Sequence, residues 1–213
     1  GATLVEIGNS VSTEEWELEA AINSNTAAVA YVYGPRQSGA LCLAEVVKIA
    51  HSKEVPVIVD ASAMLPPPEN LHKFINEGAD LVSFSGGKGL LGPQSTGILC
   101  GKSELIQAAY ANSAPNSSGV ARAAKVCKEE IAGLITALKL FVETDHKLVA
   151  EAWRGKSRYI VDQLGFIEGL DLAPRNNLIY FYPFIIIMED SNRSTILYII
   201  IIIKFIFKSI FKI

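Results

Sequence analysis

The 213-residue sequence has few cysteines and no excess of basic charge. Its three cysteines, Cys42, Cys100 and Cys127, lie far apart, and neither a CxxC pair nor a Cys/His cluster occurs. This spacing predicts no disulfide framework and no metal site, and it favours free thiols in a cytoplasmic compartment. The formal net charge of −3 argues against a protein that binds nucleic acid through a general basic face.

Apolar residues are distributed unevenly along the chain. The mean hydropathy is +0.30, yet residues 178–213 hold 13 isoleucines in 36 positions while residues 1–177 hold 11. Residues 1–177 carry a net charge of −5 and an ordinary mixture of Ala, Gly, Glu and Val. The composition therefore describes two different parts, which have to be interpreted separately.

Short apolar runs alternate with segments whose apolar residues have helical spacing. The runs predict buried strands at residues 28–33, 55–60, 79–84 and 96–100. The other segments predict helices at residues 13–23, 40–52, 69–77 and 103–110. Residues 120–164 predict two long helices, with a break near residues 144–146. Ser12 and Glu15 have the spacing of a capping box at the start of the first helix. The alternation predicts an α/β fold with a mostly parallel sheet covered by helices on both faces.

Polar side chains lie at the predicted carboxyl ends of two strands. Asp60 ends one strand, and Ser83, Ser85 and Lys88 lie at or just beyond the end of another. Ligands of open parallel sheets bind at this edge, so these residues predict a pocket. An acid and a lysine in such a pocket suit pyridoxal phosphate, which needs a lysine for its Schiff base and a carboxylate beside its ring nitrogen.

Other motifs cover the same residues. Residues 87–92 match GxGxxG, but Pro93 follows where a helix should open. Residues 85–88 match the SxxK motif of acyl-transfer enzymes, which normally lies on a helix. The two adjacent glycines, Gly86 and Gly87, disfavour a helix here by roughly 2 kcal/mol. Residues 97–103 are one residue short of a phosphate-binding loop. A plain solvated lysine in a flexible loop is the remaining interpretation of Lys88.

Two arginines and three histidines complete the set of candidate residues. Arg36 and Arg122 are candidate binders of a substrate carboxylate or phosphate. His51, His72 and His146 lie in or beside predicted helices without a metal-like partner, so we expect them to be solvated at the surface.

A dense stretch of the sequence resembles the selenocysteine synthase family, which comprises L-seryl-tRNA(Sec) selenium transferase and relatives similar to D-glucosaminate-6-phosphate ammonia-lyase. The matching motifs are Val59-Asp60-Ala61-Ser62-Ala63, Leu65-Pro66-Pro67, Gly78-Ala79-Asp80-Leu81-Val82, Phe84-Ser85-Gly86-Gly87-Lys88-Gly89, Gly92-Pro93-Gln94 and Lys128-Glu129-Glu130-Ile131. The resemblance covers about residues 1–170 and is strongest over residues 59–101.

The resemblance implies a fold type I pyridoxal-phosphate enzyme, usually a homodimer or higher homo-oligomer. In it Lys88 corresponds to the Schiff-base lysine, Asp60 to the partner of the pyridine nitrogen, and Ser85 and, less directly, Ser83 to phosphate contacts. The implied reaction uses an amino acid or amino sugar acid. The substrate amine displaces Lys88, the freed lysine removes the α-proton, and a β-leaving group departs before replacement (transferase) or release (lyase).

Some features depart from the family. The Gly-Gly before Lys88 and residues 94–97 are more similar to the lyase-like relatives. The net charge of −5 over residues 1–177 offers no evident basic surface for tRNA. Family members are longer, and the sequence begins with Gly1 rather than Met. We therefore expect an N-terminally incomplete large domain at residues 1–165 and the start of a truncated small domain at 166–177. A catalytically inactive fragment is the alternative to an active enzyme.

The last 36 residues match nothing in the family. Residues 196–213 approach the length of a membrane-spanning helix, but Lys204, Lys208 and Lys212 interrupt them. Each lysine deep in a bilayer costs roughly 2.5–3.5 kcal/mol on insertion scales. Ile, Phe, Lys, Tyr and Asn are also the residues that translated A/T-rich non-coding DNA favours. The tail is thus interpreted as foreign to the family sequence, with membrane tethering or a genuine strand as the alternatives.

Overall fold

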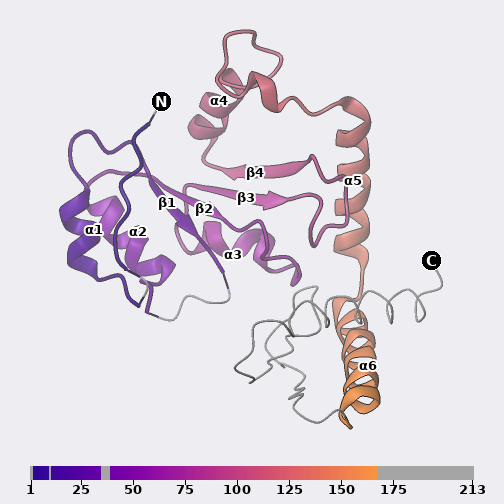
Figure 1. The fold of residues 1–213 in the computed structure, drawn as a ribbon. Coiled ribbons are helices and arrows are strands. Elements are labelled where there is room, and N and C mark those ends of the chain that lie inside the picture. The colour runs from indigo at the N-terminus through magenta and orange to yellow at the C-terminus, as the bar shows by residue number, and fades with distance from the viewer. Residues whose placement is uncertain (1, 10, 35–38, 167–213) are drawn as a thin grey trace, which may run out of the picture. The chain divides into compact units, whose positions relative to one another are not determined.

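The computed structural model describes residues 2–9, 11–34 and 39–166 (Figure 1). The chain divides into two units, and the division falls inside the last helix, after Val149. The elements, in chain order, are α1 (Glu15–Ala21), β1 (Val29–Val32), α2 (Leu43–Ser52), β2 (Val57–Asp60), α3 (Asn70–Asn76), β3 (Leu81–Ser85), β4 (Gly97–Gly101), α4 (Ser103–Ala111), η1 (Arg122–Ala124), α5 (Lys128–Glu143) and α6 (His146–Leu164).

The four strands of the described residues form one mostly parallel sheet in the order β1-β2-β3-β4 (Figure 1). β1 pairs with β2 and β2 with β3 in parallel, since each connection contains a helix that returns the chain to the same end of the sheet. β4 pairs with β3 antiparallel, because residues 86–96 join them without a helix. The predicted α/β class with a mostly parallel sheet is confirmed.

The two faces of the sheet differ in burial. Successive side chains of a strand point to opposite faces, so residues paired in register share a face. One face forms the core with α2 and α3, and its buried side chains include Val57, Val59, Val82 and Phe84, with Ile49 of α2 and Phe74 of α3 in the same cluster. On the other face of the described sheet, Val32 and Leu99 are 68% and 43% exposed. Asp60 and Ser83 lie on this more open face.

Helix α1 begins later than predicted. It starts at Glu15 rather than Thr13, and the Glu17 carboxylate accepts the backbone N–H of the N-cap residue Glu14 at 2.8 Å. The N–H of Thr13 instead donates to the carbonyl of Gly39 at 2.9 Å, which holds this segment against the loop before α2. The predicted capping box is therefore wrong, because a contact distant in sequence fixes the chain just before the helix.

Two long helices are present as predicted, but the first begins at Lys128 rather than near residue 120, after the short 3-10 helix η1. α5 and α6 are separated at Thr144 and Asp145, the break that the sequence indicates. α5 begins after Cys127, whose backbone N–H donates to the Glu130 carboxylate at 3.2 Å. No helix within residues 2–9, 11–34 and 39–166 is long and apolar enough to cross a membrane. Residues 167–213 lie outside the described residues, so the small-domain start and the isoleucine-rich tail stay predictions.

Candidate functional site

The sheet register brings Asp60 and Ser83 together. They are register partners at the carboxyl ends of β2 and β3, and the chain leaving β2 is tied to β3 by a hydrogen bond from the Ala61 N–H to the Ser83 carbonyl at 2.9 Å. Ser85 lies two residues further along β3, on the same face, and pairs with Gly97 of β4. Parallel pairing therefore places the predicted acid and both predicted serines along one edge of the sheet.

A residue that the sequence analysis did not single out connects Asp60 to Lys88. The backbone N–H of Ser62 donates to Asp60 Oδ1 at 2.9 Å, and Lys88 Nζ donates to Ser62 Oγ at 3.3 Å. The first contact is the local turn that an aspartate forms with the residue two positions later. The Asp-x-Ser spacing was thus visible in the sequence as a turn, but the reach of Lys88 to Ser62 depends on the tertiary structure.

The loop that carries Lys88 is held by its own backbone and by its neighbours. Its hydrogen bonds run from the Gly86 N–H to the Thr96 carbonyl (2.9 Å), from the Gly92 N–H to the Gly86 carbonyl (2.8 Å), from the Leu91 N–H to the Lys88 carbonyl (2.9 Å) and from Gln94 Nε2 to the Gly87 carbonyl (2.8 Å). Ser95 Oγ donates to the Glu130 carboxylate, which fastens the loop to the start of α5. Lys88 is exposed, but it projects from a loop whose conformation these hydrogen bonds hold.

The glycines beside Lys88 have a packing reason. A Cβ at Gly89 would meet the carbonyl oxygen of Leu65, and a Cβ at Gly87 would lie 2.6 Å from the Cα of Gln94. Both obstacles are backbone atoms, which cannot move aside as a flexible side chain can. Gly89 lets the Lys88 loop approach the segment that follows Asp60, and Gly87 lets the loop pack against its own residue Gln94, so both contribute to the geometry of the site.

The predicted arginines are not joined to this cluster. Arg122 lies in η1, is exposed, and its side chain makes no hydrogen bond or ion pair with another described residue. Arg36 lies outside the described residues. Their assignment as substrate-binding residues stays a prediction, as do the roles of Lys88, Asp60, Ser83 and Ser85.

A second acid and lysine lie at the opposite, amino-terminal edge of the sheet. Asp80 immediately precedes β3 and is 1% exposed. Its carboxylate accepts hydrogen bonds from Lys102 Nζ at 2.6 Å, His51 Nε2 at 2.8 Å and the Val57 N–H at 2.6 Å. Burial alone would raise the pKa of the Asp80 carboxyl, but the bonds from Lys102, His51 and Val57 outweigh it and hold the pKa below its usual range.

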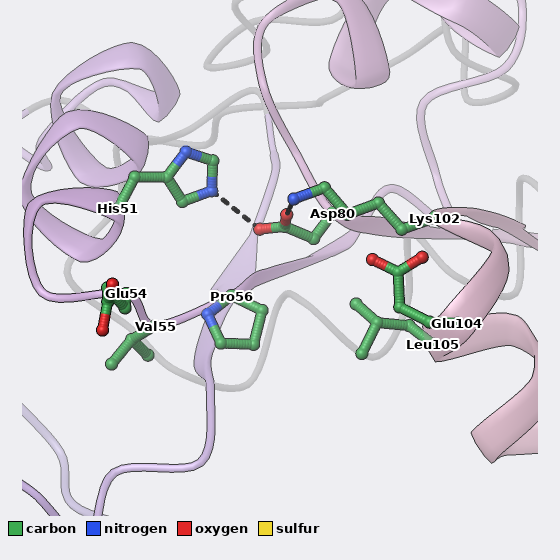
Figure 2. A pocket seen from close by; sticks show the side chains of 8 residues that line it. All are labelled: His51, Glu54, Val55, Pro56, Asp80, Lys102, Glu104 and Leu105. Atoms are coloured by element: carbon green, nitrogen blue, oxygen red, sulfur yellow. Dashed lines mark hydrogen bonds and ion pairs between the residues drawn. The ribbon is translucent and has the colours of Figure 1, made fainter.

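A shallow cavity of about 280 Å³ adjoins this second cluster, and Figure 2 shows His51 and Lys102 converging on Asp80 beside it. Its lining residues are His51, Glu54, Val55, Pro56, Asp80, Lys102, Glu104 and Leu105. Because both oxygens of the buried carboxylate are already engaged, this cluster joins α2, β2, β3 and the start of α4 rather than offering free groups to a ligand. No group of histidine, cysteine and acidic side chains within the described ranges could hold a metal ion.

Two histidines have partners that the sequence does not reveal. His51 is bonded to Asp80, and His146 Nε2 lies 2.7 Å from the Phe141 carbonyl while its ring packs 4.3 Å from the Phe141 ring. His51 is exposed, as the sequence predicts, although its bond to Asp80 was not expected, whereas His146 is half-buried and the expectation of a solvated side chain was wrong for it.

Comparison with known proteins shows that the chain is similar to enzymes. A family model described as L-seryl-tRNA selenium transferase matches residues 1–151. The chain is 38% identical over 172 residues to the D-glucosaminate-6-phosphate ammonia lyase of Salmonella typhimurium, which covers 80% of this chain and 43% of that protein. It is 31% identical over 197 residues to the L-seryl-tRNA(Sec) selenium transferase of Aquifex aeolicus, covering 81% and 42%.

A third relative and a solved structure extend the comparison. A Streptomyces 5'-C-glycyluridine monooxygenase-decarboxylase is 32% identical over 174 residues, covering 80% of this chain and 41% of that protein. A solved structure of D-glucosaminate-6-phosphate ammonia-lyase superposes with a TM-score of 0.65 at 32% identity and covers 81% of this chain and 44% of that one. The chain thus spans less than half the length of these relatives, and the resemblance noted from its motifs is confirmed.

Proposed function

The chain belongs to the L-seryl-tRNA selenium transferase family, and we propose that it is part of a pyridoxal-phosphate-dependent transferase or lyase that holds its cofactor on Lys88. The proposed substrate is an amino acid or amino sugar acid. The proposed reaction removes an α-proton and then eliminates or replaces a β-substituent. The relatives named above are enzymes of the transferase and lyase classes and of a monooxygenase-decarboxylase class.

The connected set of Lys88, Ser62 and Asp60 carries this proposal. Along the carboxyl edge of two parallel strands, the Lys88 amine donates to the Ser62 hydroxyl at 3.3 Å, and the backbone N–H of Ser62 donates to the Asp60 carboxylate at 2.9 Å. A lysine amine and a carboxylate are groups that pyridoxal phosphate requires, and here they lie where parallel sheets bind ligands. The groups present at this edge therefore fit the cofactor.

Each residue has a distinct task in the proposal. When bound, the cofactor supplies an electron sink for the pair of electrons left by the departing α-proton. Lys88 Nζ binds the cofactor and afterwards accepts that proton as a general base. Asp60 supplies the negative charge that favours a protonated ring nitrogen. The hydroxyls of Ser85 and Ser83 would donate hydrogen bonds to the phosphate, and among the described residues neither hydroxyl has another polar partner.

Two observations favour a small amino substrate over tRNA. Identity to the ammonia lyase is 38%, against 31% to the Aquifex selenium transferase. Residues 1–177 carry a net charge of −5, whereas binding to a polyanion draws on clustered Lys and Arg.

The remaining parts of the proposal concern substrate contacts, assembly and location. We propose Arg36 and Arg122 as contacts for an anionic substrate group and a homodimer or higher homo-oligomer as the assembly. We propose the cytoplasm as the location, consistent with three free cysteines.

The test of this proposal is spectroscopic. The purified chain mixed with pyridoxal phosphate is expected to develop the absorbance band of the lysine-bound cofactor, and Lys88→Ala is expected to abolish it. Lys139→Ala is the matched control, because Lys139 is an exposed lysine on α5 and should leave the band unchanged. A chain that folds, as judged by circular dichroism, but never develops the band would instead identify a catalytically inactive fragment.

A further inference from the structure

We infer that Ser62 is a positioning residue that holds both Lys88 and Asp60 at the edge of the sheet. The inference rests on the proposed role of Lys88. It assigns the hydroxyl of Ser62 to the lysine amine and the backbone N–H of Ser62 to the Asp60 carboxylate. One residue thereby sets the relative placement of the two groups that the proposed chemistry uses.

The two contacts of Ser62 come from different parts of the residue. The backbone N–H reaches Asp60 Oδ1 at 2.9 Å, so this contact survives any side-chain substitution that keeps the turn. Only Ser62 Oγ reaches Lys88 Nζ, at 3.3 Å. A substitution that removes the hydroxyl should therefore release Lys88 and leave Asp60 in place, which separates the two halves of the role.

Among the described residues, Lys88 has no second polar partner. Ser83 and Ser85 lie on the neighbouring strand, but no hydrogen bond joins their hydroxyls to the lysine amine. Lys88 itself is exposed, so packing does not fix its long side chain. An unrestrained lysine of this kind has several rotatable bonds and loses entropy when it is confined. The Ser62 hydroxyl is the group that restrains it.

Removing the hydroxyl is expected to have two effects of opposite sign. The Ser62 oxygen accepts a hydrogen bond from the lysine amine and thereby holds the amine beside Ser62. Loss of that bond should raise the reactivity of Lys88 toward a small reagent that can approach from any side. A cofactor held in one orientation needs the amine in one place, so its affinity should fall.

The experiment compares Ser62→Ala, Ser62→Thr and the unaltered 213-residue chain. Brief labelling with acetic anhydride, followed by peptide mass spectrometry, gives the acetylation of Lys88 relative to Lys125 and Lys139. Titration with pyridoxal phosphate gives the affinity from the absorbance band. We expect Ser62→Ala to raise the relative acetylation of Lys88 about five-fold and to weaken cofactor binding about five-fold, the effect of one modest hydrogen bond.

The controls separate a positioning role from a general loss of structure. Ser62→Thr keeps a hydroxyl and should restore both values toward those of the unaltered chain. Ser52→Ala removes a distant hydroxyl that donates to the Ile49 carbonyl and should change neither. General unfolding would raise the labelling of all lysines together, so the ratio to Lys125 and Lys139 would not move.

Three results would overturn the inference. Equal Lys88 acetylation in Ser62→Ala and the unaltered chain would show that the Ser62 hydroxyl does not restrain Lys88, whether or not the chain binds the cofactor. A threonine variant that behaves like the alanine variant would show that the hydroxyl is not responsible. If Ser62→Ala raises the acetylation of Lys88 but the unaltered chain takes up no cofactor, the proposed function fails and the positioning role fails with it, while the contact between Lys88 and Ser62 stands.

Discussion

The two edges of the sheet use the same residue types in opposite ways. At the amino edge, Asp80 is 1% exposed and its carboxylate accepts three hydrogen bonds, one of them from Lys102. At the carboxyl edge, Asp60 and Lys88 are exposed, and within the described part of the chain Ser62 is the residue that connects them. A buried, fully bonded carboxylate stabilises a fold, whereas an exposed and sparsely bonded one is available to a ligand. The difference supports a structural role for the amino edge and is consistent with the proposed cofactor site at the carboxyl edge.

Removal of Asp80 is expected to have the largest effect on the free energy of unfolding, and it tests the difference between the two edges. Asp80→Ala leaves the Val57 N–H without its acceptor and removes the partner of Lys102 and His51, so we expect a loss of about 3 kcal/mol in the free energy of unfolding. Urea denaturation followed by circular dichroism measures it. Asp60→Ala is the matched control, and its effect should stay within about 0.5 kcal/mol. Equal losses at both positions would contradict the division between the edges.

Substitution of Asp60 should affect binding instead of stability. Asp60→Asn keeps the shape and an oxygen that can accept the Ser62 N–H, but it removes the negative charge. We expect the affinity for pyridoxal phosphate to fall about ten-fold, or ~1.4 kcal/mol, while the urea midpoint stays unchanged. Asp80→Asn supplies the reverse pattern, with a lower midpoint. An Asp60→Asn protein that binds the cofactor normally would remove Asp60 from the proposed site.

The smallest expected effect is a dependence of stability on acid pH. Because the folded-state pKa of Asp80 is held below its ordinary value of 3.8, the unfolded chain takes up protons first as pH falls. The contribution of Asp80 is therefore complete above that ordinary value and is lost as pH falls through the lower folded-state pKa. The unaltered chain should lose stability more steeply below about pH 4 than Asp80→Asn does. Parallel urea midpoints of the two proteins across this range would argue against it.

The sequence predicts the fold well where the signal is local. Apolar runs located all four strands, and the break at Thr144 and Asp145 separated the two long helices as expected. The start of α1 was missed because the contact between Thr13 and Gly39 joins segments far apart in the chain. The partner of His51 was missed for the same reason.

The candidate site was only partly visible in the sequence. Strand ends indicated Asp60, Ser83 and Lys88, because parallel strands bring their carboxyl ends to one edge. The link through Ser62 was not predictable, since it depends on how closely the Lys88 loop approaches the segment after Asp60. That approach depends in turn on Gly89, beside which the Leu65 carbonyl leaves no space for a Cβ.

The central claim is that Lys88, and not Lys102 or another lysine, carries the cofactor. Borohydride reduction of the chain after incubation with pyridoxal phosphate fixes the cofactor to the amine that holds it, and peptide mass spectrometry then locates the modified residue. The account predicts a single modified peptide that contains Lys88. Modification at Lys102, scattered modification over exposed lysines, or no modification of a folded chain would contradict it.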